Sequence, residues 1–336
     1  MITNDNPSLS LSKKDDFSVA NPVSKFANNT VTDLLLAEEQ DATRRIAEYV
    51  AAAAADNTRR AYQSDLRAFL AWGGTLPSIP ETIAAYLVAH ATTLSPFTLS
   101  RRLVAIGRAH AILGYANPCK SELVRTTLRG VWRVHGRPQR QAQPALREDV
   151  LAMLPHMKDT RGIRDRALIL IGFAGAFRRS ELVALRYDDI TFVKEGLTLM
   201  IRRSKTDQLA EGRKIAIPFA RSHACPVKAL TSWLEHAAIQ SGPMFRTVNK
   251  AGVIGTQALS AQTVATLVKE YARKAGLDAA NYSGHSLRAG LITSAAKAGV
   301  SSWKIRQQSG HKSDAMLQRY IRDAEIFEGS AAGSVL

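Results

Sequence analysis

The stretch GLTLMIRRSKTDQLAEGRKIAIP, residues 196–218, alternates apolar and polar residues at both of its ends. Leu197, Leu199 and Ile201 recur at every second position, and Ile215 and Ile217 repeat this spacing after a polar interval. A period of two places apolar side chains on one face of a β-strand. Two such runs in succession predict an antiparallel hairpin, with a long basic turn between its strands.

On both sides of this hairpin the sequence has the spacing of helices. Residues 57–74, NTRRAYQSDLRAFLAWGG, begin with a capping residue, carry apolar residues at helical intervals and end at two glycines. The same pattern recurs in residues 32–54, 80–91, 95–114, 121–136, 146–157 and 161–177. We expect helices again from residue 225 to the end of the chain. The sequence therefore predicts a mainly α protein with a small antiparallel β-sheet.

The stretch GRPQRQAQPAL, residues 136–146, separates two regions of this pattern. It contains two prolines, two arginines and three glutamines, and too few apolar residues to pack a core. We interpret it as an extended, basic linker. The expected organisation is a mobile N-terminal tail at 1–30, a helical domain at 31–135, the linker at 136–145, a second domain at 146–323 and a C-terminal tail at 324–336.

The charge balance indicates a polyanionic partner. The 336 residues include 45 Lys and Arg against 29 Asp and Glu, a formal net charge of +16. Such an excess favours nucleic acid first and an acidic membrane surface second. The two cysteines, Cys119 and Cys225, form no CxxC pair, which argues against a disulfide framework or a zinc module. No signal peptide or membrane span is expected from the sequence.

A stripe of arginines indicates where DNA could bind. Arg125, Arg129, Arg133 and Arg137 recur every four residues on one predicted helix, which places them along one face. Like charges at this spacing repel one another unless a partner supplies anions. No Asp or Glu lies between Arg125 and residue 147, which favours a phosphate-contacting face over a merely solvated one. Further expected DNA contacts are Arg101, Arg102, Arg140 and Arg203.

Four short stretches of the second domain carry reactive side chains. Each is weak evidence alone, because an R-x-x-E pair is usually a surface ion pair and a tyrosine in a helix usually belongs to the core. The stretches are GAFRRSELVAL with Arg178 and Glu181, RRSKTD with Lys205, SGHSLRAG with His285 and Arg288, and GHKSDAMLQRYIRDA with His311 and Tyr320.

Together these residue types suit phosphoryl transfer without a metal. Attack on a phosphodiester builds negative charge on the non-bridging oxygens, and Arg178 and Arg288 could hold that charge as planar guanidinium forks. The Tyr320 hydroxyl is a poor nucleophile until a base removes its proton, a role open to His285.

The leaving oxygen needs a proton, which Lys205 on a flexible turn could supply. Glu181 could orient Arg178 from behind. The region shows no conspicuous cluster of acids that would hold a divalent metal. One adjacent acidic pair, Asp188 and Asp189, falls at an expected helix-to-strand junction, where capping is the expected role.

In this order the motifs resemble those of the tyrosine recombinases of the phage integrase family, and in particular its Cre-like branch. The similarity extends over about residues 57–323. At His311 the chain has the histidine of most of the family, where Cre itself has tryptophan. The resemblance assigns Glu181 a supporting role, and its catalytic set is Arg178, Lys205, His285, Arg288, His311 and Tyr320.

The resemblance also implies an architecture and a reaction. A helical, SAM-like core-binding domain and an α+β catalytic domain would clamp double-stranded DNA. Tyr320 would form a 3′-phosphotyrosine, leaving a free 5′-hydroxyl, and strands would exchange through a Holliday junction. No metal or other cofactor is implied.

The implied partners are inverted-repeat recombination sites and other copies of the chain. The protein would be a monomer in solution and a homotetramer on paired sites, with no membrane partner. Ile326 and Phe327 in the C-terminal tail would dock on a neighbouring subunit. The expected setting is the cytoplasm, at the nucleoid, for a protein encoded by a bacterium, a phage or a mobile element.

Two alternatives are open, of which the first shares the chemistry and the second shares the fold. A type IB topoisomerase-like strand transferase would use similar chemistry without a partner site or a tetramer. A catalytically silent DNA-binding regulator would have lost at least one catalytic position, whereas all six are present. The two-domain size and the context RYIRDA around Tyr320 favour the recombinase.

Overall fold

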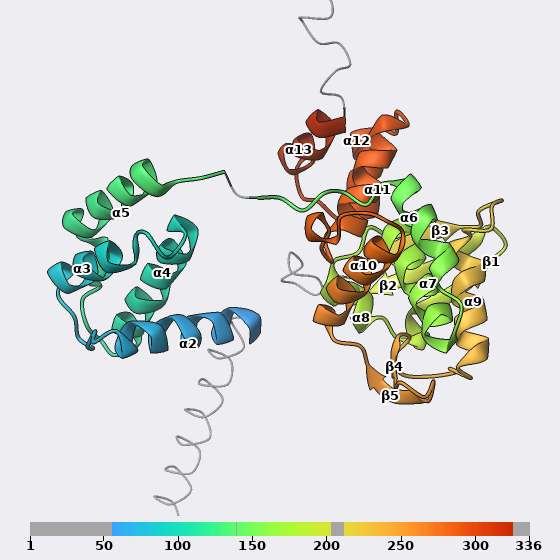
Figure 1. The fold of residues 1–336 in the computed structure, drawn as a ribbon, viewed down its shortest axis with the longest axis horizontal. Helices are drawn as coiled ribbons and strands as arrows, with labels where there is room; N and C mark the ends of the chain where they lie inside the picture. Colours follow the sequence, from blue (N-terminus) through green and yellow to red (C-terminus); the bar gives the residue numbers. More distant parts are fainter. Residues whose placement is uncertain (1–55, 139, 203–211, 325–336) are drawn as a thin grey trace, which may run out of the picture. The chain divides into compact units, whose positions relative to one another are not determined.

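The computed structural model describes residues 56–138, 140–202 and 212–324 (Figure 1). The chain divides into two compact units, residues 1–138 and 139–336, which are described one at a time. The predicted tail at 1–30, the predicted helix at 32–54 and most of the C-terminal tail lie outside the described residues.

The first unit is helical in its described part, as predicted. It consists of α2 (Asp56–Ala71), α3 (Pro80–His90), α4 (Pro96–Ile112), a 3₁₀ turn (Pro118–Lys120) and α5 (Glu122–His135). Helices α3 and α4 begin at prolines, whose missing N–H costs nothing in the first turn. The Oγ of Ser121 accepts the amide of Val124 and so caps α5. The core of this unit consists of Phe69, Ile83, Tyr86, Leu87, Leu99, Leu103, Ile106, Val124 and Val131.

The second unit is built on helices with two small sheets. Its helices are α6 (Arg147–Met153), α7 (Thr160–Ala174), α8 (Arg179–Ala184), α9 (Pro226–His236), α10 (Ala261–Lys274), α11 (Ser286–Lys297), α12 (Ser302–Ser309) and α13 (Asp314–Ala324). Helix α7 is buried along most of its length and packs against α9 and α11. The largest core residue is Trp233 on α9, whose indole N–H donates to the carbonyl of Met244 at 2.8 Å.

The predicted hairpin is confirmed. Strands β2 (Gly196–Ile201) and β3 (Arg213–Pro218) are antiparallel, with Leu197 opposite Ile217 and Leu199 opposite Ile215. These four side chains are buried on the inner face, as the alternation requires. Strand β1 (Ile190–Val193) adds to β2 and makes a three-stranded sheet in the order β1-β2-β3.

A second sheet corrects the expectation that only helices follow residue 225. Strands β4 (Arg246–Val248) and β5 (Ile254–Ala258) form an antiparallel pair between α9 and α10. The two strands are short and lie largely at the surface, so their sequence shows little apolar alternation. That absence of a period-two signal explains why the sequence did not reveal them.

The end of the predicted linker is bound to the second unit. The amides of Gln143 and Ala145 donate to the carbonyls of Asn281 and Ser286, at 2.7 and 2.9 Å. Ala145 is fully buried and belongs to the core of this unit. A Cβ at Gly290 would lie 1.7 Å from the Ala145 carbonyl oxygen, so only glycine lets the two backbones pass this closely.

Candidate active site

Most of the predicted catalytic residues meet at one place in the second unit. Arg178 lies at the start of α8 and His285 immediately before α11. Arg288 follows on the first turn of α11, His311 lies in the turn between α12 and α13, and Tyr320 lies on α13. Lys205, and with it Arg203, falls in the hairpin turn outside the described residues.

The Arg178–Glu181 pair is not a surface ion pair. The Arg178 Nη1 lies 2.6 Å from Glu181 Oε1, and the Arg178 amide donates to Oε2 at 3.0 Å. Glu181 is only 4% exposed. A buried carboxylate that holds both the amide and the guanidinium of one residue restricts the orientation of that guanidinium.

Arg288 is almost fully buried, at 1% exposure. Its Nη1 donates to the carbonyls of Ala176 and Ser309 at 2.7 and 2.5 Å, and its Nη2 lies 3.1 Å from His311 Nε2. Burial and the neighbouring Arg178 lower the pKa of Arg288 to about 10, so it keeps its charge at neutral pH. The Ala176 carbonyl belongs to a turn in which Ala176 itself has φ +48°, a left-handed conformation that is uncommon for alanine.

His311 is 9% exposed and neutral. Burial and the charge of Arg288, followed by Arg178 and His285, lower the pKa of His311 to about 3. Because a guanidinium can only donate, Nε2 accepts from Arg288 and Nδ1 carries the ring proton. That proton is directed to the Oγ of Ser309, 2.8 Å away.

The Tyr320 hydroxyl lies beside His285. The distance from Tyr320 Oη to His285 Nε2 is 2.8 Å, and the ring centroids of Tyr320 and His311 are 6.1 Å apart. The Tyr320 ring also packs on a small apolar cluster that includes Ile292 and Leu317. The residue is therefore partly a packing residue and partly a reactive one: its ring is anchored while its oxygen faces a base.

His285 is kept in its neutral form. Its residue surface is partly open to solvent, but desolvation of the ring and the charges of Arg288, Arg178 and Arg179 lower its pKa below the usual value. A neutral imidazole can accept a proton from Tyr320 at physiological pH. The arrangement can thus activate a phenol next to two guanidinium groups.

The described residues offer no rival metal site. Among residues 56–138, 140–202 and 212–324, no group of three or more His, Cys, Asp or Glu side chains could hold a metal ion. Asp189 instead accepts the amide of Arg186 and the Nε of Arg202, at 2.9 and 2.5 Å. It caps a 3₁₀ turn, as predicted for this acidic pair.

Comparison with known proteins identifies the family of the chain. The model of the phage integrase family matches residues 145–325, more than half of the chain. The chain belongs to the phage integrase family. The integrase/recombinase xerD homolog of Selenomonas ruminantium is 42% identical over 288 residues, covering 82% of this chain and 84% of the relative. Recombinase cre of Escherichia phage P1 is 26% identical over 275 residues, covering 76% and 79%.

The fold is similar to that of solved family members. A lambda integrase tetramer bound to a Holliday junction matches with a TM-score of 0.56 and 18% identity, over 81% of this chain and 73% of that one. The chain is a site-specific DNA recombinase of the tyrosine type. The predicted family is confirmed, and the comparisons give no support to the topoisomerase-like or the silent-regulator alternative.

In the first unit of this integrase-family protein, the arginine stripe is shorter than predicted. Arg125, Arg129 and Arg133 are exposed on α5, but the helix ends at His135, so Arg137 lies beyond it. Gly136 at the helix end breaks the four-residue repeat. Arg125 and Arg129 also share an acid that precedes the stripe, because Glu122 lies 3.0 and 3.7 Å from them.

The other arginines predicted to contact DNA differ in solvent exposure and in their bonding partners. Arg101 holds Asp65 through two bonds of 2.7 and 2.9 Å, with half of its side chain exposed. Arg102 is only 16% exposed and bonds the hydroxyl of Tyr86, which favours a packing role over a phosphate contact. Arg140 is exposed and donates to Asn281 of the second unit.

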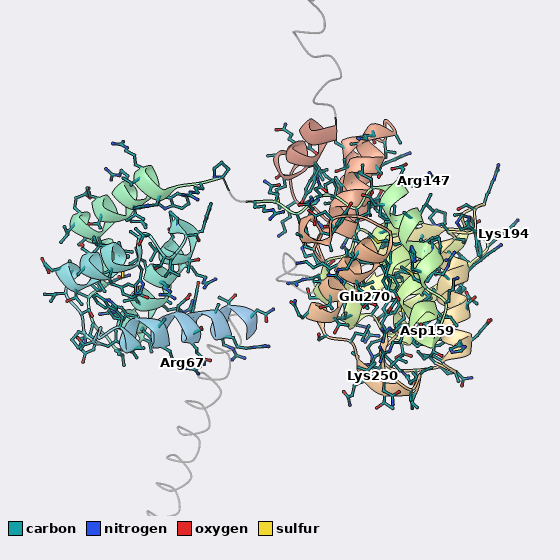
Figure 2. All side chains as sticks on the ribbon, viewed as in Figure 1. Arg67, Arg147, Asp159, Lys194, Lys250 and Glu270 are labelled. Carbon is teal, nitrogen blue, oxygen red and sulfur yellow. The ribbon has the colours of Figure 1, made fainter. Side chains whose placement is uncertain are left out.

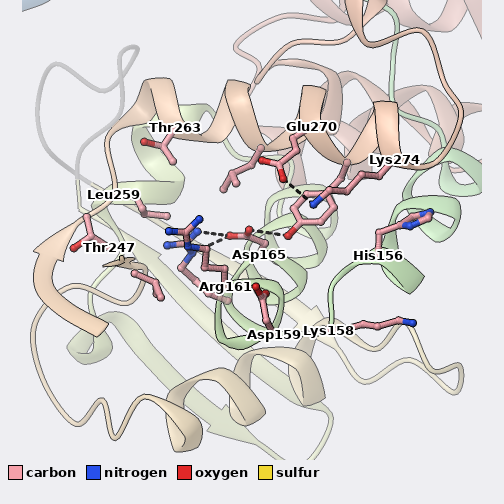
Figure 3. Close-up of a pocket in the computed structure, with 14 residues that line it drawn as sticks. His156, Lys158, Asp159, Arg161, Asp165, Thr247, Leu259, Thr263, Glu270 and Lys274 are labelled. Atoms are coloured by element: carbon pink, nitrogen blue, oxygen red, sulfur yellow. Dashed lines mark hydrogen bonds and ion pairs between the residues drawn. The ribbon is translucent and has the colours of Figure 1, made fainter. Parts of the chain in front are cut away.

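A separate cavity of about 670 Å³ lies between α7, α10 and β4 of the recombinase (Figure 3). Its wall contains a buried network in which Arg164 binds Asp165 at 2.7 Å and the Tyr271 hydroxyl donates to Asp165 at 3.0 Å. None of the described catalytic candidates lines it. Arg164 and Tyr271 thus both bind the buried carboxylate of Asp165.

Sequence reasoning missed two residues that complete the site. Ser309 accepts a hydrogen bond from the ring N–H of His311, and Arg213 lies 3.4 Å from Glu181 Oε2. Arg213 was visible only as one of several basic residues near the hairpin turn. A serine two positions before a histidine has no distinctive signal, because the contact depends on the turn at Gly310.

No described helix has both the length and the apolar run that crossing a bilayer would need.

Proposed function

We propose that Tyr320 is the nucleophile of this recombinase. Its oxygen attacks a DNA phosphorus, the bond to the 5′-oxygen breaks, and the strand is left with a 3′-phosphotyrosine and a free 5′-hydroxyl. The observation that carries the proposal is the 2.8 Å contact between Tyr320 Oη and His285 Nε2, beside the buried Arg288. Reversal of the same step by a 5′-hydroxyl from another strand would rejoin the DNA.

The remaining roles follow from charge and protonation. Arg178 and Arg288 stabilise the negative charge on the non-bridging oxygens. Arg288 keeps its guanidinium charge at neutral pH, and the carboxylate of Glu181 orients Arg178. His285 takes the proton of Tyr320, and neutral His311 supports Arg288. Lys205 is proposed as the donor to the 5′-oxygen on the strength of the sequence alone. With two guanidinium groups at the phosphate, the proposed reaction needs no metal or cofactor.

The direct test of the proposal is to trap the intermediate. A recognised duplex can be selected from random sequences by capture in SDS. The cleaved strand carries a nick shortly after the cleavage site, so the short fragment that begins with the free 5′-hydroxyl diffuses away after cleavage. Proteolysis of the trapped protein should yield a nucleotide attached to the peptide that contains Tyr320. Attachment at any other residue would reject the assignment.

The pKa of His285 sets the expected pH dependence of strand cleavage. A base works only when it is deprotonated, so cleavage falls as pH drops through the pKa of His285. Because that pKa is lowered from 6.5, we expect more than half of the maximal single-turnover rate to persist at pH 6.5. His311, with a pKa of about 3, stays neutral throughout this range and does not contribute.

The measurement is adduct formation at saturating DNA from about pH 5 to pH 8. The variant His285→Gln serves as the control, since it should be slower overall and should lack the acidic limb that His285 produces. A half-maximal rate at or above pH 6.5 in the parent protein would contradict the proposed state of His285.

We propose that the α5 arginines contact phosphates. Replacing Arg125, Arg129 and Arg133 with glutamine should weaken binding to specific and non-specific duplexes alike. The slope of log affinity against log salt should fall by about 0.9 for each phosphate that is no longer neutralised. A matched control removes three exposed charges of the second unit, Lys194 on the β1–β2 turn (Figure 2), Arg221 and Lys228. If the α5 variant keeps the parent slope, these arginines form only a solvated face.

The assembly is proposed from the family likeness. The lambda integrase structure holds a tetramer on a Holliday junction, and we infer that this chain likewise forms a homotetramer on paired inverted-repeat sites and is monomeric without DNA. Residues 31–135 would serve as the core-binding domain and residues 146–323 as the catalytic domain. The tail at 324–336, with Ile326 and Phe327, is proposed to dock on a neighbouring subunit. A protein with this activity and charge would associate with the nucleoid.

A further inference from the structure

Arg213 lies at the base of the hairpin, as the first residue of β3, opposite Ile201. Its side chain is directed inward and is only 20% exposed. The Nη2 lies 3.4 Å from Glu181 Oε2, and the Nη1 donates to the carbonyl of Gln308 at 2.8 Å. The guanidinium therefore joins the carboxylate of α8 to the end of α12.

The turn after α12 is shaped around this guanidinium. Gly310 ends the helix with φ +69°, and a Cβ at Gly310 would lie 2.8–2.9 Å from the Cζ, Nε and Nη1 atoms of Arg213. The next residue is His311, which is buried against Arg288. Arg213 thus lies between the acid that orients Arg178 and the turn that carries His311.

We propose that Arg213 is a positioning residue for strand cleavage, which holds Glu181, and through it Arg178, in fixed register with the Gln308–Gly310 turn and His311. The inference rests on the proposed function of Tyr320 and deepens it. Arg213 itself contacts neither the nucleophile nor His285 in the described contacts, so it acts through its neighbours.

The free-energy cost of burying the charged Arg213 side chain between α8 and α12 argues for a role beyond stability. Its Nε is buried and has no hydrogen-bond partner among the residues that the structure describes. Burial lowers the pKa of its guanidinium, and it lies close enough to lower the pKa of both Arg288 and His311. A buried ion pair of this kind is often matched in stability by apolar side chains of similar size. What arginine offers here is geometry, because one rigid guanidinium fork contacts both α8 and α12.

The test replaces Arg213 with methionine, which keeps much of the length and removes the donors. At saturating DNA we expect adduct formation to slow by about 10- to 100-fold, because misplacing catalytic groups by about 1 Å has effects of this size. DNA affinity should change by less than about 3-fold, since the side chain faces inward. The rate of adduct formation by Arg213→Lys should lie between those of the parent and of Arg213→Met, because an ammonium keeps the charge but cannot form the fork.

A matched control is Arg164→Met, in the wall of the cavity in Figure 3. Arg164 is also a buried arginine paired with a buried carboxylate, but it does not contact the candidate site. At a temperature where both variants are folded, Arg164→Met should cleave within about 3-fold of the parent. Equal slowing in the two variants would reduce Arg213 to a structural residue.

A double-mutant cycle with Glu181→Gln tests the route of the effect. If Arg213 acts through Glu181, Arg213→Met should cost much less in the Glu181→Gln background than in the parent, whereas independent effects would multiply. Multiplying effects, or a parent-like rate for Arg213→Met, would overturn the inference. Should Arg213→Met fail to fold, Arg213→Lys carries the same cycle. The parent protein in the same assay reports separately on Tyr320, because a missing adduct there rejects the proposed function itself.

Discussion

Replacing Tyr320 with phenylalanine is expected to abolish covalent capture of DNA while leaving the protein folded and able to bind its site. The substitution removes one hydroxyl and leaves the ring packed on Ile292 and Leu317. The hydrogen bond to His285 that disappears lies at the surface, and its net contribution to stability is about 1 kcal/mol. Without the oxygen there is no atom to form the ester, so the adduct should fall to background.

Tyr271→Phe is the matched control for this experiment. It also removes a hydroxyl that donates within the second unit, in this case to Asp165 in the cavity wall. It should form the adduct normally. The measurement is SDS-resistant protein–DNA product from a nicked site, together with binding in gel shifts and a thermal melt of each variant. An adduct formed by Tyr320→Phe at the parent level would show that another residue attacks the DNA.

Replacing Lys205 with alanine is expected to slow cleavage of ordinary DNA by about 100-fold or more, within the usual range for a lost general acid. A DNA in which sulfur replaces the bridging 5′-oxygen should reverse that loss. A thiolate leaves without a proton, since a thiol pKa is about 8.5 and that of water about 15.7. The variant should therefore cleave the sulfur-bridged site nearly as fast as the parent does. Arginines near the turn could not substitute, because a guanidinium does not give up its proton.

Arg178→Ala provides the contrast. It removes charge stabilisation at the non-bridging oxygens, so cleavage should fall by about 10²- to 10³-fold on oxygen and on sulfur alike. Single-turnover rates on the two substrates separate the roles. If sulfur fails to rescue Lys205→Ala, the lysine only positions or attracts the phosphate, and His285 or His311 becomes the next candidate for the acid.

The parts of the fold that were predictable from sequence are those with a strong period. Leu197, Leu199 and Ile201 face one buried side, so their alternation was visible and the register could be confirmed. Helix α7 is buried along most of its length, and its continuous apolar run was equally clear. Strands β4 and β5 lie at the surface, and nothing in their composition marks them.

In the candidate site, too, some residues could be predicted from their spacing in the sequence and others could not. Spacing was enough to group Arg178 with Glu181 and His285 with Arg288, because each pair lies within one turn. It could not show that Ser309 holds His311, because that contact depends on a glycine turn. Spacing alone also placed Arg137 in the arginine stripe, because the four-residue repeat of arginines continues past Gly136, where the helix ends.

Arg178 and Arg213 share the single carboxylate of Glu181, and the buried Arg288 lies close enough for their charges to lower its pKa. This grouping of arginines affects how the protein combines activity with stability. Without DNA, these like charges repel one another in a partly dry environment, and the local structure is electrostatically frustrated. A bound phosphate relieves that frustration, so the recombinase should be most rigid here when it holds its substrate. Sequences selected only for thermal stability would lose these charges early, and they would lose strand cleavage with them.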